Sequence, residues 1–476
     1  MSSTAVIILA AGQGTRMKSD LPKVLHAVNG VAMIDQVLAV ARGLRPACTV
    51  VVVGHQGERV RNHLAGADDL TFVDQTPQLG TGDAVRRCLP ALAGFDGTVV
   101  VLSGDVPLIQ AGELARLAAH HHERRAVATL FTAVVDTPGG LGRIVRDDAG
   151  HFQRIVEAKD AQPHELAIHE INAGIYCFHA DLLRRCLPDV TRDNAQGEFY
   201  LPDVVAMAVA ERAVVEALPY AEPAEALGVN SRLDLAHASA HARRRVNEAL
   251  MASGVTLVDP ATTYVEGGVE VGRDTVLHPG VCLRGATRIG AGCEIGPYSS
   301  YADAVVGDGV RDRGYSHVEG CTIAAAVLIG PYSRLRPGAE IATGAHIGNF
   351  VEVKKSRIGA GSKVNHLSYI GDTEMGAGVN VGAGTITCNY DGANKHKTVI
   401  GDDVFIGSDT QLVAPVTVGD GALIGAGTTV TQDVPAEALT LTRAPQENRP
   451  GAGKKYLDRA RAIAAEKKQR AKEEKK

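Results

Sequence analysis

Apolar side chains recur at every sixth position through most of the C-terminal half of the chain. The series is aliphatic throughout and comprises Val265, Val271, Leu277, Leu283, Ile289 and Ile295, then Ile323, Ile329, Leu335, Ile341, Ile347 and Val353, then Ile358, Val364 and Ile370, and finally Ile400, Ile406, Leu412, Val418, Ile424 and Val430. A period of six fits neither a helix nor an alternating strand. It predicts a parallel β-helix, in which each hexad forms one short strand and three hexads close a coil of about 18 residues.

Three irregularities interrupt this lattice. Asp312 falls near a position where the lattice needs an aliphatic side chain, so either the coil opens there or the register changes. The step from Val353 to Ile358 is five instead of six, and residues 382–399 form a polar stretch too long for one corner of a coil. Because a loop that leaves a regular solenoid commonly carries binding residues, we expect ligand contacts in 382–399.

The N-terminal half, residues 1–228, follows a different rhythm. Strand-like runs at 5–9, 49–53 and 98–102 are separated by apolar residues at helical spacing. This alternation predicts a Rossmann-like α/β domain with a mixed, mostly parallel sheet and helices on both faces. The expected organisation is an α/β domain at 1–228, a linker helix at 229–250, a β-helix domain at 251–440 and a tail at 441–476.

Composition agrees with a chain of more than one domain. A length of 476 residues exceeds what one hydrophobic core usually holds. Aromatic residues make up only 4 % of the chain, as expected for a solenoid filled by aliphatic ladders. The eight cysteines show neither a CxxC pair nor metal-ligand spacing, which argues against a disulfide framework and a zinc site. Without a leader-like segment or an apolar run long enough to span a bilayer, we expect a cytoplasmic protein with no membrane insertion.

The tail differs in charge from the rest of the chain. Residues 454–476 carry ten Lys and Arg against four Asp and Glu, although the whole chain has a net charge of −5. A solvated terminal helix explains this segment, and a tail that binds nucleic acid or an anionic surface is the alternative. We expect no nucleic-acid partner.

A glycine-bearing motif follows the first predicted strand. Residues 9–17 read LAAGQGTRM, and LPKVLH follows at 21–26. A turn at the end of a strand directs backbone N–H groups toward phosphate oxygens, and Arg16 and Lys23 add positive charge. A GxG turn alone is common in α/β proteins. The combination of GxGTRM with a nearby Pro-Lys resembles the signature of sugar-1-phosphate nucleotidyltransferases, which join a sugar phosphate to a nucleoside triphosphate and release pyrophosphate.

Further segments share this resemblance, namely QLGTGDA (78–84), SGDVPL (103–108) and GVN (228–230). It implies that UTP and the sugar nucleotide contact Leu9, Ala10, Ala11, Gly12, Arg16, Lys23, Gln75, Gly80, Thr81, Ser103, Gly104, Asp105 and Asn230. It also implies Mg²⁺ on Asp105 and Asn230. Mg²⁺ keeps water and phosphate ligands, so two protein oxygens suffice. An Asp after a strand is, by itself, more often a turn former.

The segments GLGRI (140–144), IVE (155–157) and EINAGI (170–175) complete the resemblance. They imply that Gly142, Glu157 and Asn172 contact the sugar, whose hydroxyl and N-acetyl groups suit a carboxylate and an amide. Asp83 stands where many relatives carry His, which leaves the detail of the base pocket open. The run 120–122 is three histidines, and we interpret it as an exposed helix end and not a metal site.

Spacing in the hexad lattice predicts a second site. Arg336 and Lys354 each follow a lattice position and are separated by one coil of about 18 residues, so they should lie on consecutive coils about 4.8 Å apart. Two cations at that separation repel each other by about 1 kcal/mol in water and by about 3–4 kcal/mol at an effective dielectric constant near 20. A bound anion would remove this repulsion. The alternative is that both flexible side chains extend into solvent.

Neighbouring residues strengthen the case for a ligand site. Glu352, His366, Tyr369 and Asn380 fall on the same or the next coils, and Asn389, Tyr390 and Lys395 follow in the polar stretch. A histidine beside a cationic phosphate site is a candidate general base. The small residues Ser408 and Ala426 are also one coil apart, and small residues stacked on successive coils leave a groove that fits a long, thin ligand such as coenzyme A.

Nearly the whole chain resembles the bacterial bifunctional N-acetylglucosamine-1-phosphate uridylyltransferase/glucosamine-1-phosphate N-acetyltransferase family. The resemblance is carried by RLRPGA (334–339), NFVEVKK (349–355), NHLSYIGD (365–372), GAGTITCNYDG (382–392), IGSDTQLVAPV (406–416) and TRAPQ (442–446). It implies His366 as the catalytic base, with glucosamine-1-phosphate on Arg336, Lys354, Tyr369 and Asn380. It implies acetyl-CoA on Ala383, Asn389, Tyr390, Ser408, Ala426 and Arg443. It further implies a left-handed β-helix that forms a homotrimer.

The activity implied is the synthesis of UDP-N-acetylglucosamine from small-molecule substrates, which supplies precursors of peptidoglycan and lipopolysaccharide. Two other interpretations stay open. In one, the β-helix serves only for oligomerisation or regulation of a nucleotidyltransferase. In the other, the chain is a non-catalytic scaffold, although a scaffold has no need of GxGTRM or Asp105.

Overall fold

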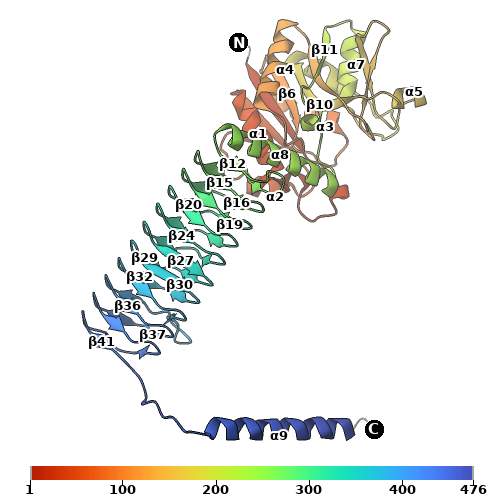
Figure 1. The fold of residues 1–476 in the computed structure, drawn as a ribbon. Helices are drawn as coiled ribbons and strands as arrows, with labels where there is room; N and C mark the ends of the chain where they lie inside the picture. Colours follow the sequence, from red (N-terminus) through yellow and green to blue (C-terminus); the bar gives the residue numbers. More distant parts are fainter. Residues whose placement is uncertain (1–2, 474–476) are drawn as a thin grey trace. The chain divides into compact units, whose positions relative to one another are not determined.

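The computed structural model describes residues 3–473, with side chains up to residue 470. The chain divides into two compact units, Met1–Asp303 and Ala304–Lys476, which are described separately (Figure 1). The first unit contains the α/β domain, the long helix α8 and the first coils of the β-helix. The second unit contains the remaining coils and the terminal helix α9.

A nine-stranded mixed sheet forms the centre of the α/β domain. Its strands are β1 (Thr4–Ala10), β4 (Cys48–Val53), β5 (Leu70–Asp74), β6 (Thr98–Ser103), β7 (Ala128–Val134), β8 (Arg143–Arg146), β9 (Phe152–Val156), β10 (Glu170–His179) and β11 (Val215–Pro219). The order β11-β7-β10-β6-β1-β4-β5 places β1 between β4 and β6. All neighbours along this path are parallel except at β10, which runs antiparallel to β6 and β7, and β8 and β9 form a side hairpin. The predicted mixed, mostly parallel sheet is confirmed.

Helices cover both faces of this sheet because its strands are apolar on both sides. In β1, Ala5 and Ile7 belong to one buried cluster, whereas Val6 and Ile8 belong to the other. The helices are α1 (Met33–Gly43), α2 (Gly57–His63), α3 (Thr81–Arg87), α4 (Ala111–Glu123), α5 (Pro163–Leu166), α6 (Ala180–Cys186) and α7 (Pro202–Ala210). Residues of α3, α6 and α7 pack in the first cluster, and residues of α1, α2 and α4 pack in the second. Near-continuous apolar strands are typical of sheets covered in this way.

Shorter elements fill the connections of this domain. They are the hairpin β2 (Ala27–Val28) and β3 (Val31–Ala32), with the 3-10 turns η1 (Thr15–Met17), η2 (Lys23–Leu25), η3 (Leu89–Leu92), η4 (Leu187–Asp189) and η5 (Pro223–Ala226). The turn η1 lies in the glycine-bearing motif after β1, and η2 lies in the LPKVLH segment that follows it.

The histidine run at the end of α4 differs from the sequence-based interpretation. His121 is buried, and its Nδ1 lies 2.9 Å from Thr129 Oγ1 on β7. Burial, with smaller contributions from neighbouring histidines, lowers the pKa of His121 from 6.5 to about 4. His122 is exposed. The prediction of an exposed helix end was therefore wrong for His121, because the helical period turns the middle histidine toward the sheet.

The long helix α8 spans Arg232–Ala252, close to the predicted 229–250. It begins with a capping box in which Ser231 Oγ accepts from the Asp234 N–H and the Asp234 carboxylate accepts from the Ser231 N–H. Ala238 and Ala242 form its buried stripe, and Asn247 donates hydrogen bonds to two backbone carbonyls in 260–263 at the start of the coils. Helix α8 is thus fixed to both the α/β domain and the first coils.

The first unit contains short parallel strands on three sides of the coils. They are β12 (Thr256–Leu257), β15 (Val276–Leu277) and β18 (Glu294–Ile295) on one side, β13 (Tyr264–Val265), β16 (Cys282–Arg284) and β19 (Ser300–Ala302) on another, and β14 (Glu270–Val271) and β17 (Arg288–Ile289) on the third.

The second unit repeats this three-sided pattern. Sheet 1 contains β21 (Arg311–Asp312), β24 (Leu328–Ile329), β27 (His346–Asn349), β30 (Lys363–His366), β33 (Asn380–Val381), β36 (Phe405–Ile406), β39 (Leu423–Ile424) and β41 (Leu439–Thr440). Sheet 2 contains β22 (His317–Glu319), β25 (Arg334–Leu335), β28 (Glu352–Lys354), β31 (Tyr369–Gly371), β34 (Ile386–Cys388), β37 (Gln411–Val413) and β40 (Thr429–Val430). Sheet 3 contains β20 (Val305–Val306), β23 (Thr322–Ile323), β26 (Glu340–Ile341), β29 (Arg357–Ile358), β32 (Thr373–Met375), β35 (Thr398–Ile400) and β38 (Val416–Val418). The predicted β-helix of hexapeptide repeats is confirmed, and the three stacked parallel sheets are those of a left-handed parallel β-helix.

The lattice positions point inward, but the coils are not all of one length. Leu335 pairs with Val353, three full hexads along the chain, whereas Ile341 pairs with Ile358, which comes one position sooner than three hexads would place it. Coils shortened in this way recur elsewhere, as in the pairing of Ile358 with Met375. The five-residue step in the sequence is therefore a shortened corner that the β-helix uses repeatedly, and the register of the inward column is unaffected.

Asp312 occupies an inward lattice position, paired with Ile329, and is 3 % exposed. Its Oδ1 accepts hydrogen bonds from the Gly314 N–H at 2.9 Å and from Ser316 Oγ at 2.7 Å. The buried carboxylate thus keeps hydrogen-bond partners, as burial requires. The coil does not open at Asp312, because the carboxylate is hydrogen-bonded to the corner residues that follow it.

The polar stretch 382–399 contains less loop than the sequence indicates. Residues 386–388 form the regular strand β34, with Thr387 buried at the inward position. The chain leaves the coil after Cys388, forms an isolated bridge between Tyr390 and Lys395, and returns at β35. The loop proper is therefore 389–397.

The terminal helix α9 (Ala452–Glu473) is exposed along the part whose side chains are described. Over the described part of the chain, no helix has the length and apolar character needed to cross a bilayer.

Candidate active sites

A cavity of about 450 Å³ opens at the carboxyl ends of β1 and β6. It is lined by ten of the predicted nucleotide residues, Leu9, Ala10, Ala11, Gly12, Lys23, Gln75, Gly80, Thr81, Ser103 and Asp105, together with Gln13, Val24, Gln78, Ala84 and Glu198. Gly104 lies within this strand end, where its N–H donates to Leu9 O at 2.9 Å. Ligands of open α/β sheets bind at this location.

The glycine turn brings Lys23 to this cavity. Gly14 has a φ of 63°, and a Cβ on Gly14 would lie 2.7 Å from Lys23 Cβ. Only glycine allows this close approach without displacing the lysine. The turn therefore determines where the Lys23 ammonium group lies.

Two oxygens from distant segments converge on that ammonium group. Lys23 Nζ forms an ion pair with Asp105 Oδ2 and donates to Asn230 Oδ1 at 3.2 Å. A carboxylate oxygen and an amide oxygen that share one cation are also suitable ligands for Mg²⁺. Within residues 3–470, no group of three or more His, Cys, Asp or Glu side chains could hold a metal. The donor set therefore fits an ion that takes its other ligands from phosphate and water.

Asp83 supports the pocket from behind. It is 2 % exposed and accepts hydrogen bonds from Gln75, Arg86 and Arg87. Burial alone would raise the pKa of Asp83, but the three hydrogen bonds together hold it below its ordinary value. Gln75 Nε2 also donates to Gly80 O at 2.8 Å. The residue that departs from the pattern of relatives thus orients Gln75 and does not line the cavity.

The predicted sugar-contacting residues form a separate cluster beside β8 and β10. The Asn172 N–H donates to Gly142 O at 2.9 Å, and a Cβ on Gly142 would lie 3.2 Å from Glu157 Oε1. Burial raises the pKa of Glu157, and the nearby carboxylates Asp160, Asp203 and Glu198 raise it further. These three residues lie together, although none of them lines the 450 Å³ cavity.

Two predicted residues face a neighbouring cavity of about 480 Å³. Arg16 and Asn230 both line it, together with Gly140 and residues of α8. The structure thus places the predicted N-terminal residues around two adjoining hollows and one nearby cluster.

In the second unit, Arg336 and Lys354 follow paired lattice positions of sheet 2, as predicted from their spacing. The Arg336 N–H donates to Val353 O at 2.9 Å, which fixes the register. Arg336 is not an isolated cation, because its guanidinium forms a 2.8 Å ion pair with Glu352 Oε1. Lys354 has a cationic neighbour in Lys395, whose pKa it lowers. Three cationic groups, Arg336, Lys354 and Lys395, and two carboxylates, Glu352 and Asp372, therefore gather at this site.

His366 ends β30 at the edge where sheet 1 meets sheet 2. Its Nδ1 lies 3.2 Å from Asn349 Oδ1, and the two residues are register partners. Asn349, His366, Ala383, Ser408 and Ala426 each stand two positions beyond an inward lattice position. They form one column, which we call the His366 column.

Backbone hydrogen bonds link the column from coil to coil. The Gly384 N–H donates to His366 O at 3.3 Å, the Asp409 N–H to Ala383 O at 2.7 Å, and the Gly427 N–H to Ser408 O at 2.8 Å. Arg443 Nε donates to Ala426 O at 3.0 Å, which places the Arg443 side chain next to the last residue of the His366 column. The predicted base and four of the predicted acetyl-CoA residues thus share one edge of the prism.

The remaining predicted residues of the acetyl site lie elsewhere on the same coils. Tyr369 points outward from sheet 2, and Asn380 lies on sheet 1 in register with Lys363. Asn389 and Tyr390 follow β34, at the far end of sheet 2, where Asn389 Nδ2 donates to Asp372 Oδ2. Within one chain, Asn389 and Tyr390 are therefore separated from the His366 column by the width of sheet 2.

Several residues that line the nucleotide cavity were not among the predicted contacts, namely Gln13, Val24, Gln78, Ala84 and Glu198. Lys395, which the sequence indicates beside Asn389 and Tyr390 in the polar loop, joins the cation cluster. Gln13, Val24, Gln78 and Ala84 lie inside the motifs at 9–17, 21–26 and 78–84, so the sequence held a signal for each of them. Glu198 had none, because it comes from a distant segment.

Each half of the chain matches a known protein family model. Residues 6–193 match the family model for a MobA-like NTP transferase domain. Residues 397–432 match the family model for bacterial transferase hexapeptide, six repeats. The two matches coincide with the α/β domain and with the later coils of the β-helix.

Relatives share almost the full length. The chain is 51 % identical over 451 residues to the bifunctional protein GlmU of Pelobacter propionicus, covering 95 % of this chain and 98 % of the relative. It is 48 % identical over 468 residues to that of Geobacter sulfurreducens, with 95 % and 98 % covered. It is 48 % identical over 454 residues to that of Listeria monocytogenes serovar 1/2a, with 95 % and 99 % covered. The chain therefore belongs to the GlmU family of bifunctional transferases, which combine nucleotidyltransferase and acyltransferase activities in UDP-N-acetylglucosamine synthesis, and the resemblance in its sequence is confirmed.

Proposed function

We propose that the two sites described above catalyse two consecutive reactions. At the His366 column, acetyl-CoA acetylates the amine of glucosamine-1-phosphate. In the α/β domain, N-acetylglucosamine-1-phosphate then takes UMP from UTP, giving UDP-N-acetylglucosamine and pyrophosphate. The observation that carries the proposal is the position of His366 at the head of a column of small residues, next to a sheet with a cation cluster.

In the acetyl transfer, His366 acts as the general base. It accepts a proton as the amine nitrogen attacks the thioester carbon, the C–S bond breaks, and the thiol of coenzyme A leaves. Asn349 Oδ1 accepts from Nδ1–H of the imidazole, which leaves Nε2 free to take the proton. Arg336 and Lys354 hold the sugar phosphate, and Tyr369 and Asn380 contact the sugar. Ala383, Asn389, Tyr390, Ser408, Ala426 and Arg443 contact acetyl-CoA.

In the uridylyl transfer, an oxygen of the sugar phosphate attacks the α-phosphorus of UTP and pyrophosphate leaves. In this proposal Lys23 and Arg16 offset phosphate charge, and the remaining predicted N-terminal residues position the two substrates. Asp105 and Asn230 would hold Mg²⁺, which supplies further charge neutralisation. Lys23 then exchanges its two oxygen partners for phosphate oxygens.

We further propose a homotrimer formed through the β-helix. Support comes from the separation of Asn389 and Tyr390 from the His366 column, since a neighbouring copy could supply one set to the other. The functional division would be 1–228 for uridylyl transfer, 229–250 as linker and 251–440 for acetyl transfer, with a tail at 441–476. UTP and acetyl-CoA are cytoplasmic metabolites, which supports a cytoplasmic location for the enzyme.

One pair of assays tests the proposal. Thiol release from acetyl-CoA with glucosamine-1-phosphate measures the first reaction, and pyrophosphate release from UTP with N-acetylglucosamine-1-phosphate measures the second. We expect both. Pyrophosphate release without thiol release would make the β-helix an oligomerisation module, and neither product would make the chain a scaffold.

A further inference from the structure

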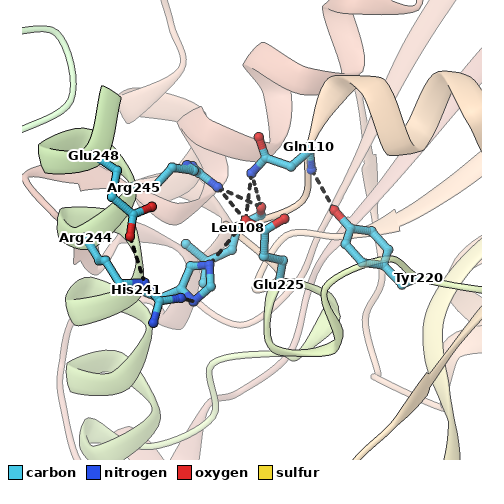
Figure 2. A network of polar contacts seen from close by, with 8 residues as sticks. All are labelled: Leu108, Gln110, Tyr220, Glu225, His241, Arg244, Arg245 and Glu248. Atoms are coloured by element: carbon cyan, nitrogen blue, oxygen red, sulfur yellow. Dashed lines mark hydrogen bonds and ion pairs between the residues drawn. The ribbon is translucent and has the colours of Figure 1, made fainter. Parts of the chain in front are cut away.

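A buried carboxylate joins three separate segments beside the proposed uridylyl site. Glu225, in η5, is 7 % exposed, and its Oε1 lies within hydrogen-bond distance of three donors (Figure 2). These are Arg245 at 3.0 Å and His241 at 3.2 Å, both on α8, and Gln110 Nε2 at 3.3 Å. One oxygen thus connects η5, the long helix and the segment that follows β6.

The segment after β6 carries Asp105 at one end and Gln110 at the other. Gln110 Nε2 also donates to Leu108 O at 2.7 Å, and Arg245 reaches the same carbonyl at 3.4 Å. Leu108 packs with Val229 against the alanine stripe of α8. Both polar and apolar contacts therefore hold the segment 105–110 against the long helix.

The segment 220–230 carries Asn230 and runs beside 105–110. The Val229 N–H donates to Asp105 O at 2.8 Å, and the Gln110 N–H donates to Tyr220 Oη at 2.9 Å. Figure 2 shows Glu225 lying between these segments and α8. Glu225 adds a third tie between the two segments, between the Tyr220 tie and the Asp105 tie.

We propose that Glu225 is a positioning residue for uridylyl transfer, which sets the separation of Asp105 and Asn230 by fixing both of their segments to α8. The inference rests on the proposed role of Asp105 and Asn230 as metal ligands. Glu225 can act on two segments at once because it belongs to the segment 220–230, while its Oε1 accepts from Gln110 of the other segment and from Arg245 of α8. Residues that hold ligand segments affect metal affinity without touching the metal.

Mn²⁺ affinity, measured by electron paramagnetic resonance in the presence of a non-hydrolysable UTP analogue, provides the test. We expect Glu225→Ala to weaken Mn²⁺ binding about 10-fold, within the range seen for residues behind metal ligands. The kcat of uridylyl transfer should fall while the KM for the sugar phosphate changes little. Glu225→Gln keeps an accepting oxygen and should recover most of the Mn²⁺ affinity. Thiol release at the acetyl site should be unchanged in every variant.

Glu248→Ala is the matched control, because Glu248 is an exposed carboxylate on α8, the helix that Glu225 contacts, and it pairs with Arg244. It should bind Mn²⁺ as the wild type does. Wild-type Mn²⁺ affinity in Glu225→Ala would overturn the proposal, provided that Asp105→Ala loses that affinity. If Asp105→Ala also retains it, the proposed metal site itself fails. Should Glu225→Ala not fold, Gln110→Ala removes one side of the same contact, and an unchanged Mn²⁺ affinity there would count equally against the proposal.

Discussion

In the α/β domain, Lys23 meets Asp105 and Asn230, which come from distant segments of the chain. In the β-helix, Arg336 and Lys354 are only one coil apart, and so are Asn349 and His366. The first site depends on three segments keeping their mutual positions. The second depends on a repeated register that inward aliphatic side chains maintain on every coil. The comparison teaches that a site on a lattice can be located by counting, whereas a site at strand ends depends on tertiary packing.

His366→Ala is expected to have the largest effect, and it tests whether the two sites act separately. Loss of a general base should slow acetyl transfer by about 100- to 10,000-fold. Pyrophosphate release should stay at its wild-type rate, because no residue of the α/β domain changes. Steady-state assays of both products measure the effect. A parallel decline in both activities, or no decline in either, would contradict the assignment of two separate sites.

Asp105→Ala is the reciprocal change. Removing this carboxylate should slow uridylyl transfer by about 100-fold or more, as loss of one charge-stabilising group does elsewhere. Thiol release should be unaffected. Asp96→Ala is a suitable control, since this carboxylate is exposed in the same domain. Equal losses in the two variants would show that Asp105 acts through folding alone.

The two regions should also differ in their response to acid. The folded-state pKa of His121 is about 4, below its ordinary value of 6.5. Between these values the unfolded chain binds a proton that the folded chain does not, so stability falls as the pH decreases from 6.5 to 4. The loss amounts to about 3 kcal/mol. Hydrogen exchange of the β7 amides, corrected for intrinsic rates, should report it.

His121→Gln should weaken this pH dependence, whereas His122→Gln, at the exposed neighbouring position, should leave it as it is. Coils of the β-helix should show a smaller change over the same range. An equal dependence in all three proteins would mean that another group controls the acid response.

The smallest expected effect concerns the proposed phosphate site, which was located from the lattice. Arg336→Ala removes a charged hydrogen-bond donor from the proposed phosphate site and should raise the KM for glucosamine-1-phosphate about 10- to 100-fold. Arg334→Ala is the matched control, because Arg334 is exposed on the strand that directly precedes Arg336. It should leave the KM near its wild-type value. Similar KM values for the two variants would remove the support that lattice position gives to the site.

Much of the β-helix was predictable because its side chains repeat with the period of the backbone. The pairing of Leu335 with Val353 follows from counting, and it aligns Arg336 with Lys354. The same count aligns Ser408 with Ala426, but it does not align His366 with Ala383 and Ser408, because a shortened coil and the loop 389–397 intervene. The shortened coils and the inward Asp312 were less accessible. A five-residue corner and a buried carboxylate with hydrogen-bond partners both interrupt the hexad pattern in the sequence. Neither of them changes the register of the strands.

The sequence alone determined the two-part architecture, the family and its two activities, because hydrophobic period and motif are local properties of the chain. Tertiary structure decided the remainder. It turned His121 inward and set Asp83 behind Gln75. It also brought Glu198 to the nucleotide cavity and Glu225 between the segments of Asp105 and Asn230. These placements depend on contacts between residues far apart in the chain, and no local pattern encodes such contacts.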